Sequence, residues 1–114
     1  MNLREQILSA EEPSLKLAPV PVPEWGTSVY MKGWSGKERE QFEKEFGDMD
    51  DAGPNVRARV LVRVLMDEAG NRIFTDEDAS ALGDKLAGPL GRLFGKVMDL
   101  SGLRNESMEA SRKN

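Results

Sequence analysis

The sequence contains no cysteine and no histidine among its 114 residues. Without cysteine there are no disulfides, no thiolate nucleophiles and no cysteine metal sites. Without histidine, Ser-His-Asp and Cys-His catalysis and ordinary zinc sites are excluded as well. Any catalysis would have to use carboxylates, Lys, Ser or Tyr, so the composition argues against an enzyme, and we expect no cofactor and no metal.

Long hydrophobic runs are also missing. No window approaches the roughly 20 apolar residues of a membrane span, and the first residues lack the apolar core of a signal peptide. A formal net charge of −4 opposes non-specific binding to nucleic acid, which depends on clustered Lys and Arg. We therefore expect no membrane partner and no nucleic-acid partner.

What remains is the composition of an ordinary soluble domain, with 39% hydrophobic and 32% charged residues. The length fits one domain, which we place at residues 1–103, followed by a polar C-terminal tail at 104–114. The 11 glycines and 6 prolines indicate some short extended chain besides helices.

The N-terminal third alternates between helix and extended chain. Asn2 is a suitable cap for a short helix that carries Leu3, Ile7 and Leu8 on one side and ends before Pro13.

A β-hairpin is predicted next. Residues 15–17 and 20–22 are expected to be extended, and the prolines among them favour a strand at a sheet edge. The segment 23–26, Pro-Glu-Trp-Gly, has the residues of a tight turn, and the β-rich segment 27–32 is expected to pair back on the first strand.

The first long helix is predicted after Ser35, which forms a capping box with Glu38. Phe42 and Phe46 mark its apolar stripe, and it ends near Gly47. Its acidic face is either solvated or a docking patch for a basic partner. Residues 48–55 are interpreted as a linker.

The segment 56–66 is ambiguous, because its valines fit both a strand alternation and a helical face. Its length and its arginines favour a largely buried central helix with the Arg stems at its margin. A turn at 67–74 is expected to deliver Ile73 and Phe74 to the core, with a tiny hairpin as one option.

Two further helices are predicted in the C-terminal third. Thr75 is a suitable cap for a helix that includes Leu86, and Gly88 should interrupt it. Pro89 is placed at the first position of the last helix, which ends at Ser101-Gly102. The predicted fold class is α+β, mainly α, with an N-terminal β-hairpin packed on a small bundle of about four helices.

Two groups of side chains are candidates for partner binding. The aromatic residues Trp25, Tyr30 and Trp34 either close the core between hairpin and helices, or one of them stays exposed as an anchor for a partner. The stripe of the last helix, with its glycines, packs internally or against another chain. The candidates are Trp25, Tyr30, Trp34, Leu90, Gly91, Leu93, Phe94, Gly95, Val97 and Met98.

Three blocks of sequence resemble the small tail assembly chaperones of long-tailed, siphovirus-type bacteriophages. The first, residues 20–39, has a Pro-punctuated strand, a Pro-Glu-Trp-Gly turn, a Val-Tyr strand and a Ser-Gly-x-Glu-Arg helix start. The others are residues 67–78 and residues 93–103, with Leu-Phe and Leu-Ser-Gly-Leu. Their order and spacing agree with the family over roughly residues 15–103.

The resemblance implies a role that needs no catalytic site. A member of this family binds the aggregation-prone tape measure protein, keeps it soluble and helps to recruit tail tube subunits. It would self-associate, act in the cytoplasm of the bacterial host and be absent from the mature virion. The alternatives are a structural minor tail or head-to-tail connector protein retained in the virion and, from another class, a small regulatory enzyme that uses carboxylates.

Overall fold

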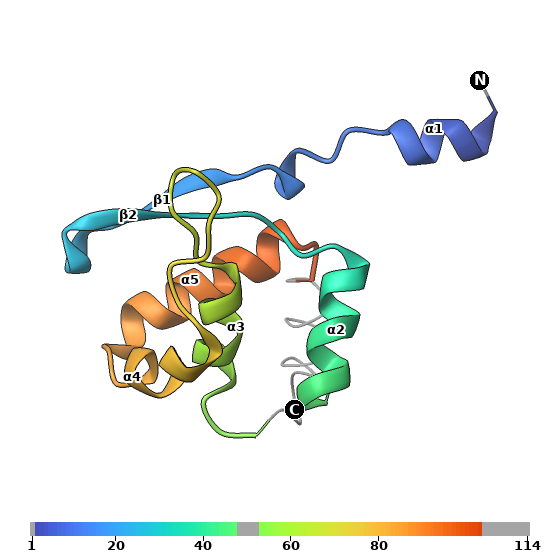
Figure 1. The fold of residues 1–114 in the computed structure, drawn as a ribbon. Coiled ribbons are helices and arrows are strands. Elements are labelled where there is room, and N and C mark those ends of the chain that lie inside the picture. Colours follow the sequence, from blue (N-terminus) through green and yellow to red (C-terminus); the bar gives the residue numbers. More distant parts are fainter. Residues whose placement is uncertain (1, 48–52, 104–114) are drawn as a thin grey trace, which may run out of the picture.

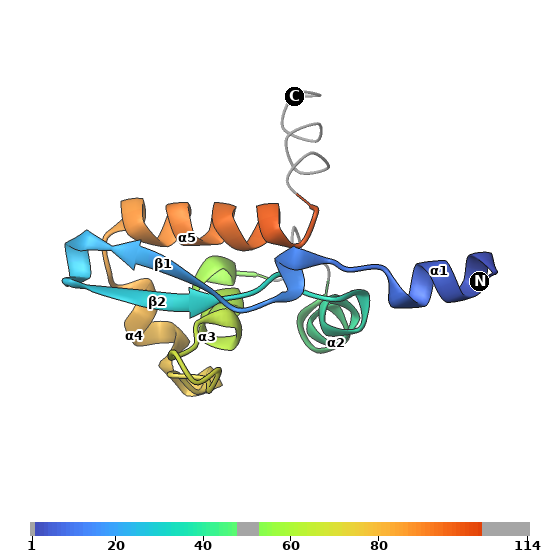
Figure 2. The same ribbon diagram turned by 90° about the horizontal axis from the view of Figure 1, so that it is seen from above.

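A computed structural model describes residues 2–47 and 53–103 and confirms the predicted fold class. The elements in chain order are α1 (Leu3–Ser9), η1 (Pro13–Leu15), β1 (Ala18–Val22), η2 (Pro23–Trp25), β2 (Thr27–Met31), α2 (Gly36–Phe46), α3 (Val56–Val64), η3 (Asp76–Asp78), α4 (Ala79–Gly83) and α5 (Ala87–Leu100). Helices α3, α4 and α5 lie on one side of the hairpin, α2 stands at its end, and α1 projects beyond the body (Figures 1 and 2). The polar tail predicted at 104–114 lies outside the described residues.

The predicted hairpin is present, with β1 antiparallel to β2. The turn between them is η2, closed by Gly26 at φ 67°, a conformation that glycine adopts without a steric penalty. The prediction of extended chain at 15–17 is wrong at its start, because Pro13 begins the η1 turn, which includes Leu15. The paired strand begins only at Ala18.

The two sheet edges differ. Tyr30 exchanges two backbone hydrogen bonds with Met66, at N···O distances of 3.0 and 2.7 Å, so its backbone groups point away from β1. By the alternation of an antiparallel pair, its cross-strand partner Pro19 faces away on the opposite edge, and so does Pro21. Both outward-facing donor positions of β1 therefore lack an N–H group.

Met66 also pairs with Arg72, which confirms a tiny hairpin in the loop after α3. Its turn is held by Asp67, whose carboxylate accepts the N–H groups of Ala69 and Asn71 at 2.9 and 3.0 Å. Phe74 packs against the core, as expected, but Ile73 is 44% exposed. The expectation for Ile73 is wrong because the loop runs along the rim of the body there and Phe74 alone reaches the core.

Helix α2 begins as predicted. Ser35 Oγ accepts the Glu38 N–H at 3.2 Å, and the Ser35 N–H donates to Glu38 Oε1 at 3.0 Å. The ambiguous segment forms the helix α3, as predicted, with five buried side chains. The helix ends at Val64, and the last two residues of the predicted segment, Leu65 and Met66, continue as extended chain. The predicted linker at 48–55 falls partly outside the described residues.

The C-terminal third differs from the prediction in where its helices begin and end. Thr75 caps η3 and donates its N–H to Asp78 Oδ2 at 2.8 Å, as expected, but α4 ends at Gly83 and leaves Leu86 73% exposed. Helix α5 begins at Ala87, which places Pro89 at its third position rather than its first. Proline is tolerated there because the first four N–H groups of a helix have no partner within it.

The core lies between the hairpin and the helices. Helix α3 is central and packs against both α4 and α5. The buried apolar residues are Val22, Val29, Met31, Trp34, Phe42, Ala58, Val60, Leu61, Val62, Val64, Leu65, Ala79, Leu82, Leu90, Leu93, Val97 and Met98.

The junction between β2 and α2 is fastened to the end of α5. The Trp34 N–H donates to Ser101 Oγ at 2.7 Å, and the Gly33 N–H donates to the Ser14 carbonyl at 2.7 Å. A Cβ atom on Gly33 would overlap the Leu100 carbonyl group, so only glycine fits this approach. The hairpin, α2 and α5 are thus positioned relative to one another at one point.

A second tie joins the hairpin turn to α5. Arg92 donates two hydrogen bonds to the Glu24 carboxylate, at 2.8 and 2.7 Å. These bonds from Arg92 lower the pKa of Glu24 to about 2. The pair holds the free end of the hairpin over the first half of the helix.

Candidate partner-binding surfaces

The three aromatic candidates differ in exposure. Trp34 is buried, with its ring centroid 5.3 Å from that of Phe42, and so has a structural role. Trp25 packs against the core but is half-buried, and Tyr30 is half-buried too. These positions agree with the interpretation of the aromatics as closing the core. Partner binding by Trp25 or Tyr30 stays a prediction.

The apolar stripe of α5 faces inward. Leu90, Leu93, Val97 and Met98 are buried, so they are not available on the surface of this chain. Phe94 is half-buried, and the Arg57 guanidinium lies 5.6 Å from its ring centroid.

The glycines of α5 lie beside the apolar stripe, with Gly91 next to the buried Met98 by helical spacing. Gly91 is half-exposed, and a Cβ atom added there would meet no atom within 4 Å. Gly95 is half-buried. At Gly91 the helix therefore has room for a closely approaching chain, and binding of a partner there stays a prediction.

Sequence reasoning missed a hollow between the end of α2, α3 and η3. This inner hollow has a volume of about 230 Å³. Its lining residues are Phe46, Arg59, Val62, Arg63, Asp76, Glu77 and Ala79. Three of these residues are apolar, and the other four, which we call the rim, carry charges of both signs. An amphipathic segment can bind to such a combination.

Arginines organise the rim of the inner hollow. The Arg63 guanidinium forms ion pairs with Glu45 and with Asp76, the latter at 3.0 Å, and lies 5.1 Å from the Phe46 ring centroid. Arg59 lies over the same ring, at 5.3 Å. Such cation–π contacts fix the ring and the guanidinium together. The sequence placed these arginines at the helix margin but gave no sign that acidic residues from two other elements would join them.

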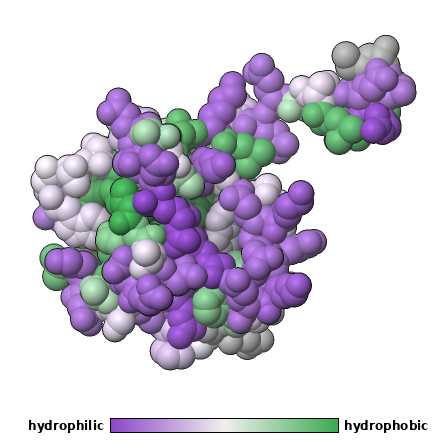
Figure 3. Space-filling model, viewed as in Figure 1, coloured by the Kyte–Doolittle hydropathy of each residue, from purple (hydrophilic) through white to green (hydrophobic). Residues whose placement is uncertain are grey.

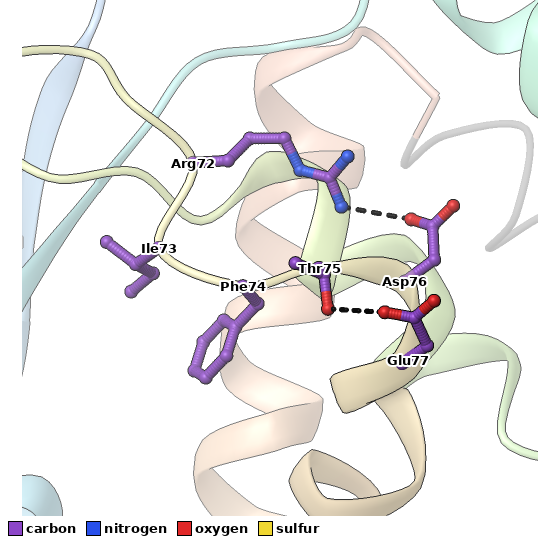
Figure 4. Close-up of a pocket in the computed structure, with 6 residues that line it drawn as sticks. All are labelled: Arg72, Ile73, Phe74, Thr75, Asp76 and Glu77. Atoms are coloured by element: carbon purple, nitrogen blue, oxygen red, sulfur yellow. Dashed lines mark hydrogen bonds and ion pairs between the residues drawn. The ribbon is translucent and has the colours of Figure 1, made fainter.

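A second hollow adjoins the first and shares Asp76 and Glu77 with it. This outer hollow is lined by residues 72–77 (Figure 4). Ile73 and Phe74 supply its apolar part, while Arg72 turns away to pair with Asp76 at 2.9 Å. Figure 3 shows apolar surface in this region, between the hairpin and η3.

The charge of Asp76 is fixed by its surroundings. Hydrogen bonds from Arg63, followed by those from Arg72, lower the pKa of Asp76 below its usual value. Arg72 in turn donates to the Val62 carbonyl at 3.0 and 3.2 Å. Asp76, which lines both hollows, therefore stays ionised near neutral pH.

Helix α1 is a third surface that the sequence did not single out as a site. It has no buried residue, and Leu3, Ile7 and Leu8 are 64–70% exposed. The helix stands clear of the body in Figures 1 and 2, and its apolar side is visible in Figure 3. Clustered exposure of large apolar side chains is unusual outside interaction sites.

Nothing in the described ranges 2–47 and 53–103 resembles a metal or membrane site. Among these residues, no three His, Cys, Asp or Glu side chains come together as metal ligands could. Their helices are too short or too polar to cross a bilayer. The surfaces described above can bind another chain but carry no arrangement for chemistry.

Comparison with known proteins decides the family. The family described as phage tail assembly chaperone matches residues 2–114, which is nearly the whole sequence. The chain belongs to the phage tail assembly chaperone family. The resemblance inferred from the three sequence blocks is therefore confirmed, and so is the conclusion that the protein is not an enzyme.

A solved structure supports the fold of this chaperone independently. The tail assembly chaperone of bacteriophage HK97 has a TM-score of 0.58 to it, at 20% sequence identity. The similarity covers 85% of this chain and 91% of the HK97 chain, so the two share a fold over most of their lengths. Among curated proteins, no sequence matches.

Proposed function

We propose that this chaperone binds the tape measure protein of its phage, keeps it soluble and helps to recruit tail tube subunits. The family match over residues 2–114 carries the proposal, because it makes tail assembly the process in which the chain acts. We further propose that it acts in the cytoplasm of the infected bacterium, associates with its own copies and is left out of the finished virion. The absence of a catalytic arrangement among the described residues is compatible with this role.

The outer hollow is the proposed docking site for the tape measure protein. A long helical protein presents apolar side chains at intervals of three and four residues, and such a stripe binds in an apolar groove. Ile73 and Phe74 offer the apolar contact, and the ionised Arg72–Asp76 pair beside them can orient a charged flank. Covering the stripe in this way would prevent client chains from associating with one another.

Co-expression with the tape measure protein tests the proposal. We expect more tape measure protein in the supernatant after centrifugation when this chain is present at matched expression. Ile73→Glu should remove most of the gain, because it places a charge on exposed apolar surface. Ser80→Glu is the matched control, since Ser80 is exposed on α4 outside both hollows, and it should retain the gain.

Two outcomes would contradict the proposal. Equal soluble yield with and without the chain would remove the chaperone role toward this client. Equal yields for Ile73→Glu and the unaltered chain would move the docking site away from the outer hollow. Mass spectrometry of purified virions tests the competing function, since a minor tail or connector protein would be found in the particle.

A further inference from the structure

Helix α1 is too short to be more than marginally stable by itself. It has seven residues, and isolated helices shorter than about 12–15 residues are marginal in water even with good helix formers. Its Asn2 cap, which accepts the Glu5 N–H at 2.8 Å, adds a single bond. The three large side chains that would stabilise it by burial, Leu3, Ile7 and Leu8, face solvent instead. Packing against another surface is what this helix lacks.

The body holds the arm, residues 2–13 with α1, at a distance from its own hollows. Ser14 is fixed to Gly33 by a 2.7 Å backbone hydrogen bond, at the end of the body where α2 begins. From there the chain leads outward, and α1 is the element farthest from the hairpin turn in Figures 1 and 2. The inner hollow lies elsewhere, between the end of α2 and η3, and no described residue of this chain fills it.

We propose that α1 of one copy docks in the inner hollow of a second copy. Each copy carries one exposed apolar helix and one apolar hollow that no described residue fills, so exchange between copies would cover both. The charges are compatible with this contact: Arg4 and Glu5 lie on α1 beside its apolar side chains, and the lining of the hollow carries charges of both signs. This inference rests on the self-association included in the proposed function and assigns it to particular residues.

The geometry of such a contact determines the assembly. The arm and the hollow are different surfaces, so the interface is heterologous and each copy can both give and receive an arm. Contacts of this kind form a closed ring if the rotation between copies closes and an open filament if it does not. Removing either surface from every copy should leave monomers.

Sedimentation velocity at micromolar concentration tests the arm. The unaltered chain should sediment as a species larger than a monomer. Ile7→Glu should weaken the assembly by at least about tenfold, because burial of one such side chain supplies that much affinity. The neighbouring Gln6→Glu, which adds the same charge outside the apolar stripe, should leave assembly unchanged. At concentrations too low for assembly, neither should change the melting temperature, since α1 contributes no buried residue.

Mixing two defective variants tests the pairing of arm with hollow. Arg59→Glu alters the rim of the hollow and leaves the arm intact, while Ile7→Glu does the reverse. Each should be a monomer alone, and an equimolar mixture should form a dimer that grows no further, because one intact arm and one intact hollow remain per pair. Circular dichroism and melting of Arg59→Glu establish that it is folded.

Several results would overturn the inference. A monomeric unaltered chain would remove self-association, and with it the exchange. Assembly of Ile7→Glu as in the unaltered chain would show that α1 is not the contact, and a mixture that stays monomeric would show that α1 docks elsewhere than in the inner hollow. If Ile7→Glu still assembles but no longer keeps the tape measure protein soluble, α1 binds the client rather than a second copy. Retained solubility in that variant leaves the chaperone function intact whichever way the exchange is decided.

Discussion

A single methyl group at Gly33 should destabilise the fold, although the substitution is usually mild. The added Cβ would overlap the Leu100 carbonyl, which is backbone at the end of α5 and cannot rotate away. Overpacking of this kind costs about 3 kcal/mol when nothing soft can yield. Alanine also reduces the entropy of the unfolded chain, which offsets somewhat under 1 kcal/mol. The net loss is therefore about 2 kcal/mol of unfolding free energy.

Thermal melts of Gly33→Ala and Gly91→Ala measure this effect against a matched control. A loss of about 2 kcal/mol lowers the melting temperature of a domain of this size by roughly 8–10 °C. Gly91 lies inside α5, and a Cβ atom added to it would have no neighbour within 4 Å. The same substitution there should therefore stabilise the helix by up to about 1 kcal/mol and raise the melting temperature. A Gly33→Ala melt within about 2 °C of the unaltered chain would refute the reasoning, because the two backbones would then not be in contact.

Two other substitutions have effects whose size or pH range follows from the structure. Trp34→Ala should lower the free energy of unfolding, measured in urea, by about 3–5 kcal/mol, because the ring is buried in the core. The same substitution at half-buried Trp25 should lower it clearly less. Equal losses would contradict the difference in burial between the two rings. The pKa of Glu24 falls from 4.5 to about 2 on pairing with Arg92, so this pair stabilises the fold fully above pH 4.5, and the contribution is lost as the pH falls toward 2. Glu24→Gln should therefore show a shallower loss of unfolding free energy between those pH values, and an unchanged slope would show that the pair does not act in solution.

Local signals in the sequence were sufficient to predict much of the fold. The capping box at Ser35 and the turn residues at 23–26 each depend on neighbours within a few positions, and both are where the pattern placed them. The segment 56–66 was decided by length and by its arginines rather than by periodicity, and it forms a helix up to Val64. Its last two residues leave the helix because Met66 pairs with the hairpin, a contact that no local pattern contains.

The candidate surfaces were harder to predict because they depend on residues distant in sequence. The apolar stripe of α5 has the same spacing whether it faces the core or a partner, and only the positions of α3 and the hairpin decide that Leu93 and Val97 are internal. The inner hollow exists because Phe46 and Ala79, which belong to separate helices, flank the same part of α3. Helical periodicity at Ile7 was visible, but periodicity cannot show that this side chain is exposed among the described residues.

The two prolines of β1 help to explain how a protein can bind an aggregation-prone client without being incorporated into its aggregates. Ordered aggregates grow by adding strands to an open edge through backbone hydrogen bonds. Pro19 and Pro21 face outward on one edge and cannot donate such bonds, and on the other edge Tyr30 is already paired with Met66. At these positions the hairpin is therefore a poor template for strand addition. Under the proposed function, contact with the client is restricted to side chains, which can release it when the tail is built.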